Sequence, residues 1–161
     1  MNESIEPSGE AIAQTEVESE FEELDVESGP SVGIVMGSKS DMPTMEKAGK
    51  ELEERRIRSE VRVMSAHRQP DLVAEYAKEL KFRGFRVVIA GAGLSAALPG
   101  VVAAHTDLPV IGVPLTSSMS VAGGLDALLA IAQMPPGVPV ACVGVDNARN
   151  AAVLAARILG A

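Results

Sequence analysis

Two short polar segments hold the side chains best suited to chemistry. The first, residues 65–70, reads Ser-Ala-His-Arg-Gln-Pro and contains His67, one of two histidines in the chain. Imidazole transfers protons readily near neutral pH. The guanidinium of the adjacent Arg68 is a planar fork that fits a phosphate or a carboxylate. This pair predicts acid–base chemistry on an anionic ligand.

The second polar segment, residues 37–41, reads Gly-Ser-Lys-Ser-Asp. Its small residues allow backbone N–H groups to approach an anion, and the N-terminus of a following helix adds a favourable dipole. The spacing is not that of a Walker A loop. Asp41 is suited either to capping the next helix or to accepting hydrogen bonds from ribose hydroxyls, and the sequence leaves both roles open.

A third segment, residues 91–96, reads Gly-Ala-Gly-Leu-Ser-Ala and is loosely similar to a dinucleotide-binding fingerprint. It follows the third apolar run of the chain rather than the first, and Asp107 is poorly spaced for a ribose contact. Its small residues indicate that the backbone closely approaches a ligand or another subunit.

The remaining reactive residues favour structural roles. His105 is expected at a helix end, in contact with the C-terminal end of the helix dipole. Cys142 is the only cysteine, lies in the apolar run 138–145 and is expected to be a buried thiol. Histidine, cysteine and carboxylate residues do not cluster at metal-ligand spacing, so no metal site is predicted.

From residue 31 onward, apolar runs alternate with amphipathic stretches, as five strands each followed by a helix would. Apolar runs of this kind are typical of a parallel sheet covered on both faces. We therefore predict an α/β fold, a flavodoxin-like three-layer αβα sandwich with strand order 2-1-3-4-5. Ligands bind at the carboxyl ends of such strands, where the polar segments lie. The expected strands are 32–36, 60–64, 87–90, 110–113 and 138–145, and the expected helices begin near Asp41, Gln69, Leu98, Leu125 and Ala148.

The net charge of −8 is unevenly distributed along the chain. Residues 1–30 carry ten acidic side chains and no Lys or Arg, so the rest of the chain carries a net charge of +2. A near-neutral domain is compatible with an anionic ligand. Aromatic residues make up only 2% of the chain, which argues against a nucleic-acid partner bound by base stacking.

One folded domain is expected over residues 31–161, preceded by a disordered acidic tail over residues 1–30. The tail is rich in Glu and Ser, so it buries too little apolar surface to offset its ordering entropy. Phe21 and Leu24 leave open a short helix docked on the domain or on a partner. The sequence contains neither a signal peptide nor an apolar stretch of membrane-spanning length, so we expect a cytoplasmic protein without a membrane partner.

These residues alone predict an acid–base enzyme that acts on a small phosphorylated ligand. The alternative from another class is a nucleotide- or flavin-binding module without catalysis. At its polar segments the sequence resembles the catalytic subunit of phosphoribosylaminoimidazole carboxylase, a family that includes the N5-carboxyaminoimidazole ribonucleotide mutases. The resemblance covers roughly residues 32–159 and rests on several motifs in the same order, at residues 36–41, 65–70, 90–93, 98–100, 109–114 and 133–135.

The resemblance implies interconversion of N5-carboxyaminoimidazole ribonucleotide and 4-carboxyaminoimidazole ribonucleotide in purine biosynthesis, without ATP, biotin, metal or another cofactor. The carbamate would release CO2 into a closed pocket, C4 would capture it, and His67 would shuttle the proton. Ser38 and Asp41 would contact phosphate and ribose, and Arg68 would contact phosphate. The other implied substrate-binding positions are Gly37, Ser40, Ser65, Ala66, Gly91, Ala92 and Gly93.

The resemblance also implies a homo-oligomer, an octamer. Alanines of the last expected helix are small enough to pack closely against other subunits, although they could instead cover the helix's own sheet. They are Ala151, Ala152, Ala155 and Ala156.

Residues 93–100 depart from the family pattern Gly-Gly-Ala-Ala-His-Leu-Pro-Gly. Leu94 stands where the pattern has glycine, and Ala97 stands where it has histidine. Ser95 is a candidate to replace a lost hydrogen bond. Two related activities stay open: direct carboxylation of aminoimidazole ribonucleotide by CO2, and carboxylation of a pyridinium dinucleotide. The motifs at 98–100 and 133–135 favour the mutase class, and those at 38–41 and 65–70 argue against the pyridinium relative.

Overall fold

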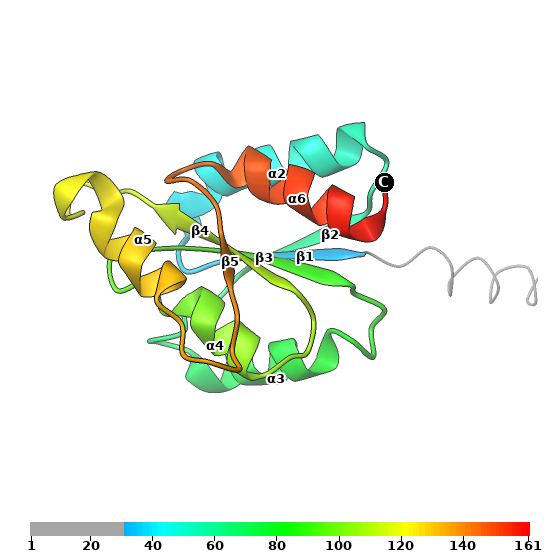
Figure 1. The fold of residues 1–161 in the computed structure, drawn as a ribbon, viewed down its shortest axis with the longest axis horizontal. Helices are drawn as coiled ribbons and strands as arrows, with labels where there is room; N and C mark the ends of the chain where they lie inside the picture. The colour runs from blue at the N-terminus through cyan, green and yellow to red at the C-terminus, as the bar shows by residue number, and fades with distance from the viewer. Residues whose placement is uncertain (1–30) are drawn as a thin grey trace, which may run out of the picture.

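The computed structural model describes residues 31–161 as a three-layer α/β sandwich around one parallel sheet (Figure 1). The strand order is β2-β1-β3-β4-β5, which confirms the predicted topology. The expectations for residues 1–30 lie outside the described residues. The five strands are β1 (Val32–Met36), β2 (Ser59–Val63), β3 (Val87–Gly93), β4 (Val110–Leu115) and β5 (Ala141–Cys142).

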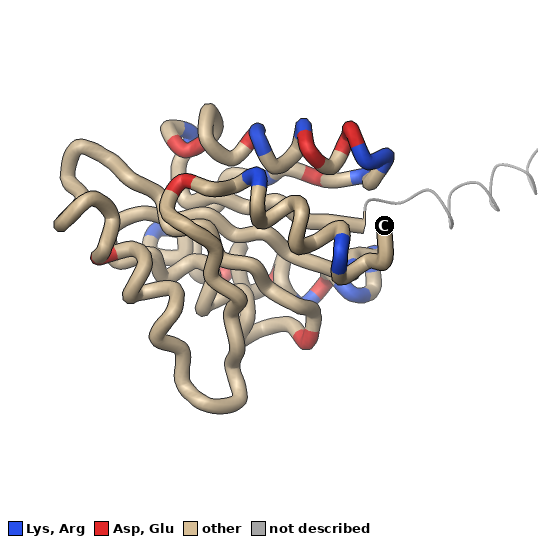
Figure 2. The backbone as a smooth tube through the Cα atoms, turned by 45° about the horizontal axis from the view of Figure 1, so that its top comes forward, with Lys and Arg blue, Asp and Glu red and all other residues tan. Residues whose placement is uncertain are grey.

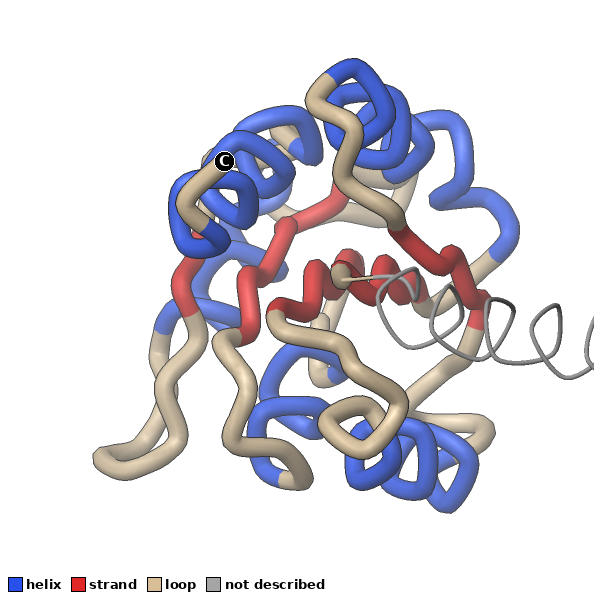
Figure 3. Tube along the Cα trace, turned by 90° about the vertical axis from the view of Figure 1, so that its right-hand side faces the viewer, coloured by secondary structure: helices blue, strands red, loops and turns tan. Residues whose placement is uncertain are grey.

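Helices cover both faces of the sheet (Figure 3). On one face, α2 (Met42–Glu54) and α6 (Ala148–Leu159) pack against alternate strand residues such as Ile34 and Ile89. On the other face lie α3 (Pro70–Glu79), α4 (Leu98–Ala104) and α5 (Leu125–Ala132). Since successive strand side chains point to opposite faces, one apolar run supplies both cores.

The alanines of α6 face the sheet of their own chain. Ala151, Ala152 and Ala155 belong to the core on this face of the sheet, and they and Ala156 are fully buried within the chain. Of the two roles that the sequence left open, the structure therefore supports cover of the helix's own sheet. Because these alanines are buried within their own chain, they cannot make the expected contact with other subunits.

Two central strands are longer than their apolar runs predict. β3 ends at Gly93 instead of residue 90, and β4 ends at Leu115 instead of residue 113. Small residues continue the ladder, with Ala92 opposite Pro114 and Gly93 opposite Leu115. A Cβ atom on Gly93 would lie 2.9 Å from the carbonyl oxygen of Leu115, so the close approach of the two strands requires glycine there.

The last strand is much shorter than predicted. Of the expected run 138–145, only Ala141 and Cys142 pair with β4. β5 is an edge strand, and Pro139 lacks the N–H that a ladder needs. Cys142 is therefore half-buried rather than buried, and its partial burial raises the pKa of its thiol.

Glu51 joins the two helices of one layer. Its carboxylate accepts a hydrogen bond from Arg149 of α6 at 2.7 Å, and it forms an ion pair with Arg55 at 2.8 Å. Only 6% of the Glu51 side chain is exposed, whereas Arg149 is largely in solvent. Hydrogen bonds from Arg149 and Arg55 hold the pKa of Glu51 below its ordinary value.

This lowered pKa predicts acid sensitivity at the α2–α6 contact. A carboxylate with a depressed folded-state pKa stabilises the fold above its unfolded-state pKa, and that contribution disappears as the pH falls through the folded-state value. Glu51→Gln is expected to be less stable than the wild type at pH 7. Its free energy of unfolding should then fall less between pH 7 and about pH 3, near and below the carboxyl range.

Urea unfolding at the two pH values measures this difference. Glu46→Gln is the matched control, since Glu46 forms the exposed pair with Lys50 at 3.5 Å on the same helix. An equal acid dependence in Glu51→Gln and the wild type would contradict the prediction.

Among residues 31–161, no helix is both long and apolar enough to cross a membrane.

Candidate active site

A cavity of about 490 Å³ opens at the carboxyl ends of β1, β2, β3 and β4. It brings together ten of the eleven residues predicted for the site, from three segments of the chain. Gly91 is the exception: it lies in β3, buried against Met45 and Leu115, and does not line the cavity. The ten are Gly37, Ser38, Ser40, Asp41, Ser65, Ala66, His67, Arg68, Ala92 and Gly93.

The segment after β1 forms a 3-10 turn, η1 (Lys39–Asp41), before α2 begins. Ser38 caps this turn: its hydroxyl accepts from the Ser40 N–H at 3.3 Å, and its own N–H donates to Asp41 Oδ2 at 3.1 Å. Asp41 is the third residue of this capping box; it occupies the N-cap position of α2 but makes no side-chain cap bond to that helix. The predicted capping of α2 by Asp41 is therefore not observed, and one face of the turn lines the cavity.

Asp41 is the one carboxylate among the described residues that line this cavity. Burial raises the pKa of this carboxyl, and the hydrogen bond from the Ser38 N–H acts in the opposite direction. One Asp41 oxygen is held by that N–H, so the other is available to a ligand hydroxyl. A sugar hydroxyl is a suitable donor to it.

The segment after β2 is a tight turn that orients His67 and Arg68. Ser65 is buried at its base, where its carbonyl accepts from the Gln69 N–H at 2.8 Å and its hydroxyl accepts from the Arg68 N–H at 3.3 Å. Pro70 then starts α3. His67 lies at the exposed crest of the turn and lines the cavity.

Arg68 connects two loops that are far apart in sequence. Its Nη2 donates to the carbonyl oxygen of Gly37 at 3.2 Å, across 31 residues. The side chain is otherwise exposed, so the remaining N–H groups of its fork are free to bind an anion. Among residues 31–161 it is the one Lys or Arg that lines this cavity.

Basic side chains are spread over the domain (Figure 2). Lys39 lies in η1 between the lining residues Ser38 and Ser40 but does not itself line the cavity, Arg55 is the C-cap residue of α2, and Arg157 lies in the last turn of α6. Because charge in solvent is screened over about 10 Å in salt, the lining Arg68 and the neighbouring Lys39 are the basic residues placed to attract an anion to this cavity.

The end of β3, the segment after it and the start of α4 supply a largely apolar wall. It contains the buried Ala92, Ala96 and Leu98, with the exposed Leu94 and Ser95 at its edge. Leu94 has a φ of +55°, in the left-handed region that a branched side chain rarely adopts. Such a residue costs about 1–3 kcal/mol and persists only where its surroundings hold it.

The segment after β4 adds lining residues that were not among the predicted site residues. Thr116, Ser117 and Met119 face the cavity. Asp146 holds Thr116 in place by accepting from its N–H at 2.9 Å and from its hydroxyl. The one sequence signal for these lining residues was their position directly after a strand. The hydrogen bond from Thr116 to Asp146 joins residues 30 positions apart, and no local pattern predicts it.

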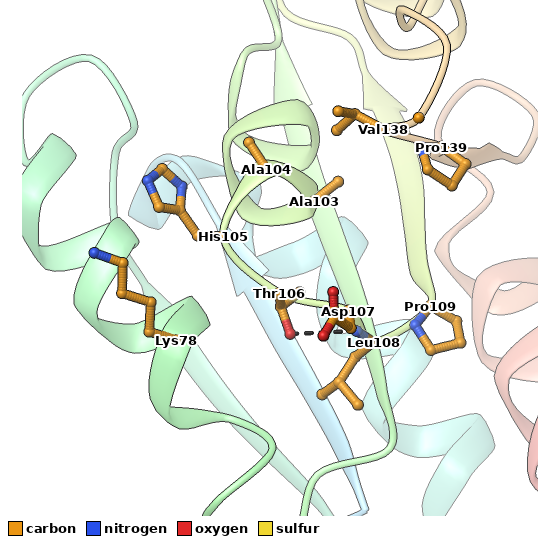
Figure 4. Close-up of a pocket in the computed structure, with 11 residues that line it drawn as sticks. Lys78, Ala103, Ala104, His105, Thr106, Asp107, Leu108, Pro109, Val138 and Pro139 are labelled. Carbon is orange, nitrogen blue, oxygen red and sulfur yellow. Dashed lines mark hydrogen bonds between the residues drawn. The ribbon is translucent and has the colours of Figure 1, made fainter.

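A larger cavity of about 820 Å³ lies at the opposite end of the sheet (Figure 4). It is lined by Lys78, His105 and Asp107, together with backbone and apolar groups. His105 Nδ1 lies 2.9 Å from the carbonyl oxygen of Val101, which confirms the predicted helix-end contact. This cavity contains none of the predicted site residues and lies at the amino ends of the strands, so it is not the candidate active site.

The cavity at the carboxyl ends combines a cationic fork, several hydroxyls, a carboxylate and one imidazole. These groups suit a phosphorylated, hydroxyl-bearing ligand and proton transfer. Within the part of the chain that the structure describes, no three His, Cys, Asp or Glu residues are grouped as metal ligands. A doubly wound α/β sheet with such a cavity at its carboxyl edge defines the class: a small-ligand protein of flavodoxin-like topology.

Comparison with known proteins identifies the family within this class. Residues 31–161 match the AIR carboxylase family, and the chain belongs to that family. It is 56% identical over 130 residues to the N5-carboxyaminoimidazole ribonucleotide mutase of Pyrococcus abyssi, covering 81% of this chain and 74% of that one. It is equally identical over 131 residues to the mutase of Thermotoga maritima, covering 81% and 75%.

The fold agrees with solved structures of the family. The crystal structure of Treponema denticola PurE superposes with a TM-score of 0.70 at 36% identity, covering 81% of this chain and 80% of that one. The predicted family and the predicted flavodoxin-like topology are both confirmed.

Proposed function

We propose that this protein interconverts N5-carboxyaminoimidazole ribonucleotide and 4-carboxyaminoimidazole ribonucleotide in purine biosynthesis. One observation carries the proposal: His67 and Arg68 share a single cavity with the capped Ser38–Asp41 turn. The chain's 56% identity to curated mutases supports it. No cofactor is required in this proposal.

The polar side of the cavity supports the proposed binding mode. The free N–H groups of Arg68 and the hydroxyls of Ser38 and Ser40 would hold the phosphate. The Asp41 carboxylate would accept from the ribose. These contacts direct the imidazole ring of the ligand toward His67 and the apolar wall.

The proposed reaction balances without a co-reactant. The bond between N5 and the carbamate carbon breaks, N5 receives a proton from His67, and CO2 is released. The enamine electron pair at C4 then forms a bond to CO2, and the C4 proton passes back to His67. Holding CO2 beside the ring makes this recapture effectively intramolecular.

Supplying candidate substrates to the purified protein, without ATP, tests the function. We expect 4-carboxyaminoimidazole ribonucleotide to form from the N5-carboxy compound, measured by absorbance or chromatography. Product only from aminoimidazole ribonucleotide with high CO2 would show the direct carboxylase instead. If neither substrate gives product, the proposed function is wrong, and carboxylation of a pyridinium dinucleotide or a non-catalytic binding role is favoured instead.

We also propose that the chain assembles as an octamer. The α5 side chains Leu125 and Leu129 are 45% and 49% exposed, and Val121 in the preceding loop is 65% exposed. These three apolar side chains are exposed to water in a single chain, on and just before a helix that contacts the short edge strand β5. A surface of this kind favours burial between subunits.

Light scattering at micromolar concentration measures this assembly. The wild type is expected at eight times the chain mass of 16.7 kDa. Leu129→Asp should shift it to smaller species, because it places a charge in the contact. Leu72→Asp is the matched control, since Leu72 is similarly exposed on α3. A monomeric wild type would contradict the proposal.

The proposed location is the cytoplasm. The single cysteine, Cys142, excludes an intrachain disulfide, as is common for proteins of reducing compartments.

A further inference from the structure

Leu94 is strained and faces the candidate active site. Its φ is +55°, its side chain is 38% exposed, and it lines the same cavity as His67. Leucine has no polar side chain that could stabilise this backbone conformation by a local hydrogen bond. Strained residues of this kind gather at sites where the strain serves a function.

The surroundings of Leu94 indicate what that function is. Its neighbours in the wall are the buried Ala92, Ala96 and Leu98, whose side chains neither donate nor accept hydrogen bonds, and the exposed Ser95, whose hydroxyl is the polar group of this segment. The phosphate- and ribose-binding groups lie on the other segments of the cavity. The buried part of the wall, at Ala92, Ala96 and Leu98, is therefore suited to a small uncharged molecule, whereas bicarbonate would lose its hydration there without compensation.

The position of Leu94 distinguishes it from the rest of the wall. Ala92, Ala96 and Leu98 are at most 7% exposed and form its buried part. Leu94 is the exposed apolar residue of the wall and lies next to the exposed Ser95, so it is placed where the wall meets the cavity mouth. An isobutyl group at that point obstructs both the escape of CO2 and the entry of water.

We propose that Leu94 retains CO2 between its release from N5 and its capture by C4. This role rests on the proposed mutase function and deepens it. Leu94 takes no part in proton transfer and forms no bond. It sets the fraction of released CO2 that becomes product instead of escaping and leaving aminoimidazole ribonucleotide behind.

Three variants separate retention of CO2 from relief of backbone strain. Leu94→Gly and Leu94→Asn both accept the left-handed conformation, but the first removes the side chain and the second makes it polar at similar size. Leu94→Met keeps an apolar side chain of similar volume and keeps the strain. A purely structural role predicts that Gly and Asn behave at least as well as the wild type.

The measurement is the ratio of aminoimidazole ribonucleotide released to 4-carboxyaminoimidazole ribonucleotide formed, starting from the N5-carboxy compound. A parallel reaction with His67→Asn corrects for spontaneous decarboxylation. The ratio is expected to rise about tenfold in Leu94→Gly and Leu94→Asn, since escape then competes with recapture, and to stay near the wild-type value in Leu94→Met. Thermal melting of each variant shows that it is folded.

An unchanged ratio in a folded, active Leu94→Gly protein would overturn the role of Leu94 while leaving the mutase function in place. A rise in Leu94→Met equal to that in Leu94→Asn would also overturn it. A wild-type protein that forms no 4-carboxyaminoimidazole ribonucleotide would overturn the mutase function and the role of Leu94 together.

Discussion

Replacing His67 with asparagine is expected to lower kcat by about 10²- to 10⁴-fold, the range typical of a lost general acid–base. Asparagine preserves a polar side chain of similar reach but cannot accept and return a proton near neutral pH. His67 lies at the exposed crest of its turn, and the hydrogen bonds that shape the turn come from Ser65, so the loop should keep its conformation.

Ligand binding provides the control for this variant. Calorimetric titration with 4-carboxyaminoimidazole ribonucleotide should give a Kd close to that of the wild type, because Arg68 and the Ser38–Asp41 turn are intact. His105→Asn is the matched substitution, since His105 faces the opposite cavity. A His67→Asn protein with wild-type kcat would refute the role of His67 in proton transfer.

Replacing Arg68 with alanine is expected to raise KM by about 10- to 100-fold, since a hydrogen bond to a charged group contributes about 1.5–3 kcal/mol. The structure gives the reason for so large an effect from one exposed residue. Arg68 is the one Lys or Arg lining the cavity among residues 31–161. Its bond to the Gly37 carbonyl also joins the two loops that would enclose the phosphate.

Arg68→Lys refines this test. Lysine keeps the charge but loses the planar fork, so its KM should lie between those of the wild type and the alanine variant. Arg86→Ala, an exposed substitution outside the cavity, is the matched control. If Arg68→Ala and Arg86→Ala show the same KM, Arg68 does not contact the phosphate.

Much of the fold was predictable because its signals are local. The apolar run of β1 and the start of α4 at Leu98 were placed correctly, and the expected 2-1-3-4-5 order was confirmed. The predicted strand ends were wrong where pairing with a neighbouring strand sets the length of a strand. β3 and β4 continue through Gly93 and Leu115 because each ladder extends the other, and β5 shortens because it has one partner.

In the candidate site, too, the features set by local sequence were predictable and those set by distant residues were not. The Ser-Ala-His-Arg turn and the Gly-Ser-Lys-Ser-Asp turn were recognisable, since each needs particular residues at consecutive positions. Thr116 was not recognisable, because Asp146 positions it from 30 residues away. Gly91 was assigned to the site through the family resemblance, whereas the longer β3 buries it in the sheet.

The sequence by itself determined the order of the βα units, the polar residues that follow each strand, and a histidine directly beside an arginine in one of those polar segments. It could do so because strand and helix periodicity and turn chemistry depend on neighbouring residues. Only the tertiary structure decided that these turns share one cavity, that the alanines of α6 face inward, and that Leu94 is held in the left-handed conformation. Those outcomes depend on which segments meet across the sheet, and residues far apart in the chain jointly set that geometry.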